Sequence, residues 1–184
     1  MRLFRLLTVY MALALCANAA LADTAALEAL REGDLKKLMF HPTPKPASES
    51  EFQLADGAGT GTLDEYQGKY VLLNFWATWC APCVKEMPLL DTLAADYEGR
   101  LRVLTVSQDM QGAEKVEPFF AQADFALLEP WMDPGNELGF AIGGGMMPTT
   151  VLYDATGKEV WRVLGDYDWG ASDARAAIDA AIAG

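Results

Sequence analysis

Histidine and cysteine are scarce in this sequence. Its 184 residues include one histidine, His41, and three cysteines, of which Cys16 lies near the N-terminus and Cys80 and Cys83 lie close together. A structural zinc site normally needs four nitrogen or sulfur ligands. Beyond the first 22 residues only His41, Cys80 and Cys83 are of these two types, so we expect no zinc site.

Positive charge is also in short supply. Lysine and arginine together number 14 against 26 aspartates and glutamates, which gives a formal net charge of −12. Nucleic acid and anionic membrane surfaces repel such a protein, so neither is expected as a partner. The acidity suits basic protein partners, or simply a solvated acidic surface.

Long hydrophobic runs are absent except at the N-terminus. Arg2 and Arg5 precede the apolar run Leu6–Cys16, and small residues follow it up to Ala22. The run is short for a membrane-spanning helix, and the pattern is typical of a secretory signal cleaved after Ala22 or after Ala19. The alternative is that residues 1–22 stay attached as an inner-membrane anchor. Either way, we expect the rest of the chain in an oxidising compartment, the periplasm.

Residues 23–50 are predicted to form a helical segment and a proline-rich linker. Leucines recur at helical spacing between Asp23 and Phe40, which favours a short helix or helical pair. The alternating prolines of His41–Pro46 cannot continue a helix, so they predict a stiff linker. The main domain is then expected to span residues 51–184, which is long enough to bury a core without a structural disulfide.

The order of apolar and turn-forming stretches predicts an α/β domain with one central mixed sheet. Strands are expected at residues 52–54, 60–63, 70–76, 101–106, 149–153 and 159–163. Helices are expected at residues 82–97, 116–123 and 171–183. The first two strands and the last two should form hairpins, and a loop-rich insert at 130–145, with one helical turn at 136–140, precedes the final hairpin.

The sequence Trp79-Cys80-Ala81-Pro82-Cys83 lies where the strand at 70–76 gives way to the helix at 82–97. Two cysteines separated by two residues can close a small disulfide. At a helix start their sulfurs meet the positive end of the helix dipole, which favours thiolate over thiol at Cys80. Because a thiolate is the species that attacks disulfides, the motif predicts thiol–disulfide exchange.

These residues carry a family resemblance. Asn74–Cys83, Pro88 five positions later and Met147–Thr149 before a late strand resemble the motifs of thioredoxin-fold proteins. Within that superfamily, Val71–Pro88, the insert and the signal segment are similar to the exported TlpA/ResA-like oxidoreductases, which are related to DsbE and CcmG. The resemblance implies a thioredoxin-like fold over residues 51–183. Its features would be a central mixed β-sheet flanked by helices, an N-terminal β-hairpin extension and an insert before the final hairpin.

The resemblance also implies a role for Glu86. Ordinary thioredoxins have a buried aspartate that assists proton transfer to the second cysteine. This chain has Asn74 at that position, and an asparagine cannot ionise. TlpA/ResA-like proteins often carry a glutamate three residues after the second cysteine, where this chain has Glu86. If Glu86 is buried beside Cys83, its pKa should rise, and it could accept the proton of that thiol. The alternative is an ordinary solvated glutamate.

Pro148 is expected to follow a cis peptide bond and to face the cysteines, as the proline that opens the late strand does in this superfamily. That geometry would expose the backbone of Met147 for pairing with a substrate polypeptide. Together with Trp79 and Pro82, these two residues are predicted to bind substrate. Trp76, by contrast, is expected in the core.

The function predicted from the resemblance is a periplasmic protein disulfide reductase. It would act on dedicated clients of the cytochrome c maturation or copper-site assembly type, without a diffusible cofactor or bound metal. A membrane dithiol carrier of the DsbD/CcdA type would re-reduce it, and a monomer is expected. The sequence leaves open a disulfide-forming oxidant, a Cu(I) carrier that uses the thioether of Met146 or Met147, and a non-catalytic adaptor.

Overall fold

The computed structural model describes residues 36–41, 43–57, 59–143 and 145–183. Its strands in chain order are β1 (Leu38–Met39), β2 (Phe52–Leu54), β3 (Thr60–Gly61), β4 (Tyr70–Trp76), β5 (Leu101–Ser107), β6 (Trp131–Met132), β7 (Thr149–Tyr153) and β8 (Glu159–Leu164). Its helices are the 3-10 helix η2 (Leu63–Tyr66) and the α-helices α2 (Ala81–Asp96), α3 (Ala113–Ala123), α4 (Glu137–Ile142) and α5 (Ser172–Ala183). Among the described residues, no helix is long and apolar enough to cross a membrane.

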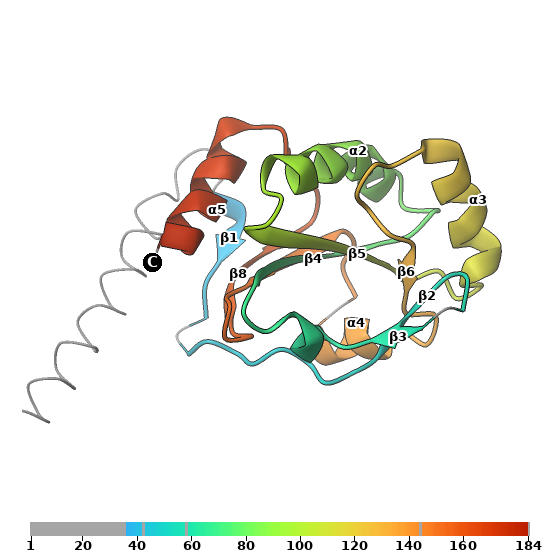
Figure 1. Ribbon diagram of the computed structural model, residues 1–184, viewed down its shortest axis with the longest axis horizontal. Coiled ribbons are helices and arrows are strands. Elements are labelled where there is room, and N and C mark those ends of the chain that lie inside the picture. The colour runs from blue at the N-terminus through green and yellow to red at the C-terminus, as the bar shows by residue number, and fades with distance from the viewer. Residues whose placement is uncertain (1–35, 42, 58, 144, 184) are drawn as a thin grey trace, which may run out of the picture.

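The described strands form one mixed sheet in the order β1-β8-β7-β4-β5-β6-β2-β3. Neighbours β4, β5 and β6 run parallel, and the other neighbouring strands are antiparallel. Helices α2, α3 and α5 lie on one face of the sheet, and α4 and η2 lie on the other (Figure 1). The predicted α/β architecture with hairpins β2–β3 and β7–β8 is confirmed, with element ends within a few residues.

Strand β4 is buried on both faces, as its nearly continuous apolar sequence predicts. Leu72 and Trp76 pack on the α2 side, whereas Leu73 and Phe75 pack on the α4 side. Asn74 therefore points toward α2, because side chains alternate along a strand. Trp76 is fully buried, as expected.

The register of the central strands brings three loops to one edge of the sheet. Trp76 pairs with Ser107 at the C-terminal ends of the parallel strands β4 and β5. Phe75 pairs with Thr149 at the N-terminal start of the antiparallel strand β7. The segments after β4, after β5 and before β7 consequently meet at this edge, which we call the site edge.

The N-terminal segment corrects one prediction. Leu38 and Met39 form β1, which pairs with Val163 and Arg162 of β8, rather than part of a helix. Leu38 is buried in the main core, and a leucine spacing that suits a helix does not show a partner strand far along the chain. The proline segment also lies along the sheet, because Pro46 forms a bridge with Lys158. The predicted signal at 1–22 and residues 23–35 of the predicted helical segment lie outside the described residues.

The insert at 130–145 is more regular than predicted. Trp131 and Met132 form β6, which pairs with β5 on one side and with β2 on the other. The N-terminal hairpin thereby joins the main sheet. The helical turn expected at 136–140 is the helix α4, which continues to Ile142. A two-residue strand is too short to show a period in the sequence, so β6 could not be predicted from it.

Candidate redox site

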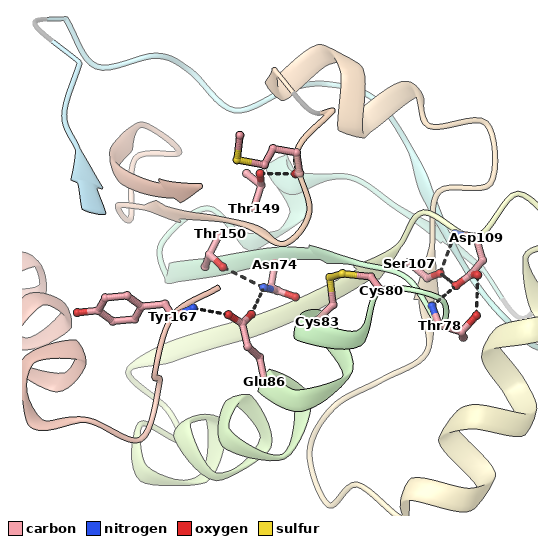
Figure 2. The surroundings of a disulfide bond; sticks show 11 residues. Asn74, Thr78, Cys80, Cys83, Glu86, Ser107, Asp109, Thr149, Thr150 and Tyr167 are labelled. Atoms are coloured by element: carbon pink, nitrogen blue, oxygen red, sulfur yellow. Dashed lines mark hydrogen bonds between the residues drawn. A yellow bond between two sulfur atoms is a disulfide. The ribbon is translucent and has the colours of Figure 1, made fainter. Parts of the chain in front are cut away.

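Cys80 and Cys83 form a disulfide at the start of α2 (Figure 2). The S–S distance is 1.99 Å and the two Cα atoms lie 5.3 Å apart. Cys80 is the residue that caps the N-terminus of α2, and Cys83 lies in the first turn. The pair predicted from the sequence is therefore joined, and both sulfurs lie at the helix end where the dipole favours negative charge.

The two cysteines differ in their access to solvent. Cys80 keeps 6% of its surface exposed, whereas Cys83 keeps 1%. The flanking Trp79 is 67% exposed, and Pro82 is also exposed. A reactant arriving from solvent therefore meets Cys80 before Cys83.

The turn before Cys80 is held by a residue that the sequence analysis missed. The backbone N–H of Cys80 donates to the carbonyl of Ala77 at 3.0 Å, which closes a tight turn. Asp109 is fully buried and accepts hydrogen bonds from the backbone N–H of Thr78 at 2.8 Å and from its hydroxyl at 2.7 Å. The Ser107 hydroxyl donates to the same carboxylate at 2.8 Å. A sequence signal existed, because Asp109 lies two residues after the end of a buried strand.

Glu86 lies in a buried polar row between α2, β4 and β7 (Figure 2). One carboxylate oxygen accepts the backbone N–H of Tyr167 at 2.6 Å. The other accepts the Asn74 amide at 3.5 Å, and the same amide donates to the Thr150 hydroxyl at 2.9 Å. Glu86 is 3% exposed, so the structure places it inside the protein as the resemblance implied, and not in solvent.

Burial changes the ionisation of Glu86. Desolvation raises its pKa from 4.5 to about 7, against the opposing hydrogen bond from the Tyr167 amide. The indole N–H of Trp169 also lowers the pKa of Glu86, because it favours the charged carboxylate. It has no hydrogen-bond partner among the described residues. Near neutral pH both protonation states of Glu86 are therefore populated, which suits a group that takes up and returns a proton.

The loop before β7 brings Met147 and Pro148 to the site edge. The peptide bond between them is cis, which confirms the prediction. Pro148 is buried and Met147 is half-buried. Among the described residues, neither the backbone N–H nor the backbone carbonyl of Met147 has a hydrogen-bond partner.

Exposed apolar side chains gather in the segments around the site edge. Trp79, Met110, Phe140 and Met146 are 67%, 78%, 72% and 54% exposed, and we call these four residues the apolar rim. Phe140 and Met146 also line a cavity of about 80 Å³. The described residues include one other exposed large apolar side chain, Met39 on the edge strand β1. Clustered exposed apolar surface is typical of an interaction site.

His41 does not join the cysteines. Its Nε2 atom lies 3.0 Å from a carboxylate oxygen of Glu159. Glu159 pairs with Tyr153 at the end of β7 opposite the site edge. The histidine and the cysteine pair thus belong to opposite ends of the sheet.

Comparison with known proteins assigns the family. A sequence model described as AhpC/TSA family matches residues 45–165, about two thirds of the chain. The chain belongs to the AhpC/TSA family. This AhpC/TSA protein is similar to the thiol-disulfide oxidoreductase ResA of Bacillus cereus, with 35% identity over 105 residues. That match covers 56% of this chain and 60% of ResA, so the chain spans about three fifths of the length of this curated relative.

Two further relatives agree with this assignment. The thioredoxin-like protein YneN of Bacillus subtilis is 48% identical over 97 residues, which are 52% of this chain and 56% of YneN. The crystal structure of the exposed lipoprotein thioredoxin Etrx1 of Streptococcus pneumoniae superimposes with a TM-score of 0.62 at 26% identity. It covers 72% of this AhpC/TSA chain and 99% of Etrx1. The thioredoxin-like fold predicted from the sequence is confirmed.

Proposed function

We propose that this protein is a thiol–disulfide oxidoreductase that exchanges electrons with disulfides of client proteins through Cys80 and Cys83. The observation that carries the proposal is the disulfide at the start of α2, in which Cys80 is the more exposed residue and Cys83 is almost fully buried. The relative ResA, which is named a thiol-disulfide oxidoreductase, supports it.

The reaction proceeds in two exchanges. In the reduced protein, the Cys80 thiolate attacks one sulfur of the client disulfide, forms a mixed disulfide and releases the first client thiolate. Cys83 then loses its proton and attacks the Cys80 sulfur. This forms the Cys80–Cys83 disulfide and releases the second client thiolate. Two electrons pass to the client, and the enzyme ends oxidised.

Glu86 accepts the proton of Cys83 in the second exchange. The two residues lie three positions apart on α2, and such neighbours share a face of a helix. A pKa of about 7 lets the Glu86 carboxylate take the proton near neutral pH and release it afterwards. Asn74 cannot take up the proton; its buried carbonyl oxygen, which has no hydrogen-bond partner among the described residues, can only accept a hydrogen bond.

The client polypeptide docks at the loop before β7. The backbone N–H and carbonyl of Met147, next to Pro148, have no hydrogen-bond partner in the part of the chain that the structure describes, and an extended client segment pairs with them in the manner of a β-strand. Trp79 and Pro82 contact the client beside Cys80. The apolar rim then receives apolar side chains that flank the client disulfide.

The protein acts as a reductant in the periplasm on dedicated clients of the cytochrome c maturation or copper-site assembly type. A membrane dithiol carrier of the DsbD/CcdA type returns it to the reduced state, and no diffusible cofactor or bound metal takes part. Similarity to an exposed lipoprotein thioredoxin supports an exported location. Measurement of the Cys80–Cys83 potential tests the direction: a value below about −200 mV supports a reductant, and one near −120 mV an oxidant.

Trapping of the mixed disulfide tests the exchange itself. In a Cys83→Ala variant the second step is impossible, so a client with a disulfide should remain linked to Cys80 until a reductant is added. A Cys80→Ala variant is the matched control and should trap nothing. If Cys83→Ala captures no client while the wild-type protein retains one Cu(I) per chain, the oxidoreductase is ruled out in favour of a copper carrier.

A further inference from the structure

Asp109 is a buried carboxylate whose contacts lead to the nucleophile. One of its oxygens accepts the Thr78 hydroxyl, and the other accepts the Thr78 backbone N–H and the Ser107 hydroxyl (Figure 2). None of the ion pairs among the described residues includes Asp109. A fully buried charge without a counter-ion is costly unless hydrogen bonds compensate it. Three groups donate hydrogen bonds to this carboxylate, and two of them, the backbone N–H and the hydroxyl of Thr78, belong to the turn that precedes Cys80.

The turn transmits this hold to Cys80. Thr78 is the second residue of the turn that the Cys80 N–H closes onto Ala77, and Cys80 is the cap of α2. The base of the turn is fixed as well, because the backbone N–H of Gln108 donates to the carbonyl of Trp76 at 2.8 Å. The Trp79 side chain between Thr78 and Cys80 is mostly exposed and contributes little packing.

We propose that Asp109 is a positioning residue that keeps the Cys80 sulfur at the N-terminus of α2 when the disulfide is open. In the oxidised protein the S–S bond ties Cys80 to the helix. Reduction removes that bond, and the hydrogen bonds from Thr78 to Asp109 then hold the turn. The Cys80 sulfur stays in the field of the helix dipole, which favours its thiolate. The inference rests on the proposed function and extends it to the reduced state.

Substitutions at Thr78 test this without changing any charge. Helix α2 carries the titratable residues Cys83, Lys85, Glu86, Asp91 and Asp96, and Asp109 lies after β5; a substitution at Thr78 leaves all of them in place. Thr78→Val keeps the shape of the side chain and removes its hydroxyl. Thr78→Ser keeps the hydroxyl and is the matched control.

The readout is alkylation of Cys80 in the reduced full-length protein, followed by mass spectrometry as a function of pH. In Thr78→Val we expect the midpoint for Cys80 to rise by about one pH unit and the rate near pH 7 to fall about tenfold. Thr78→Ser should stay within about twofold of wild type. A Thr78→Val protein with the wild-type midpoint and rate would overturn the proposal.

A measurement on the unaltered protein guards against a variant that does not fold. The Thr78 N–H donates to Asp109 in the oxidised protein. If that bond persists in the reduced protein, as proposed, amide hydrogen exchange at Thr78 should remain slow after reduction. Loss of that protection on reduction would overturn the proposal. Alkylation and hydrogen exchange need no client, so both measurements test the role of Asp109 independently of catalysis. Failure to reduce any client disulfide would instead refute the proposed function.

Discussion

Replacement of Glu86 by glutamine removes a carboxyl group from the buried polar row and nearly preserves its shape. In the wild-type protein the pKa of Glu86 is about 7, against 4.5 for a solvated glutamate. At a pH between these two pKa values, Glu86 of the folded protein keeps a proton that the unfolded chain has released. The corresponding stabilisation is fully present below about pH 4.5 and is lost as the pH rises through about 7. The difference of roughly 2.5 pKa units corresponds to about 3 kcal/mol in the free energy of unfolding.

Urea unfolding of the oxidised proteins measures this difference. From about pH 4 to about pH 8, the Glu86→Gln variant should gain about 3 kcal/mol of stability relative to wild type, because it has no carboxyl group to ionise. Glu98, an exposed residue shortly after α2, provides the control. Glu98→Gln should follow the wild-type pH dependence. If Glu86→Gln also runs parallel to wild type, Glu86 does not ionise in a desolvated site and the reasoning fails.

The same variant tests the proton transfer. Glu86→Gln should form the mixed disulfide through Cys80 at the wild-type rate but resolve it more slowly, by about tenfold to a hundredfold. Stopped-flow measurement of the two phases separates formation from resolution. Equal resolution rates in variant and wild type across the pH range would remove Glu86 from the mechanism.

Two further predictions concern the surface and the helix beside the site. Phe140→Ser removes an exposed member of the apolar rim and should lower kcat/KM for a protein disulfide about threefold to tenfold, while reduction of a small-molecule disulfide stays unchanged. Met39→Ser, on the far edge of the sheet, is the control, and an equal loss in both variants would rule out docking at the rim. Gly139→Ala places a Cβ against the Gln108 amide oxygen and should cost about 1–3 kcal/mol of stability by thermal or urea unfolding. Gly59→Ala meets no atom within 4 Å and should cost less; equal costs would contradict the packing argument.

Much of the fold could be predicted because the central elements carry strong patterns. Strands β4 and β5 are long apolar runs, and α2 has apolar residues at helical spacing between clear turn signals. Strands β1 and β6 have two residues each and exist through pairing with β8, β5 and β2. Such pairing depends on residues far away in the sequence, and no local pattern encodes it.

The site shows the same division. The cysteine pair is readable because its spacing and its place at a helix start carry the chemistry directly. Burial of Glu86 is not a property of the residue type: it depends on the Tyr167 amide, which lies 81 positions away in the chain. The role of Glu86 was accordingly predicted through family resemblance. Asp109 was missed because the pairing of Trp76 with Ser107 is what brings it to the turn at Thr78.

The proposed exchange requires that Cys80 is an accessible thiolate at neutral pH in the reduced protein. The most direct test follows the thiolate absorbance of the reduced protein near 240 nm as the pH is raised, with Cys80→Ala as the reference that isolates its contribution. We expect the Cys80 contribution to titrate about one unit or more below the value of about 8.5 for a free cysteine. A midpoint at or above that of free cysteine would show that Cys80 is not the nucleophile at neutral pH.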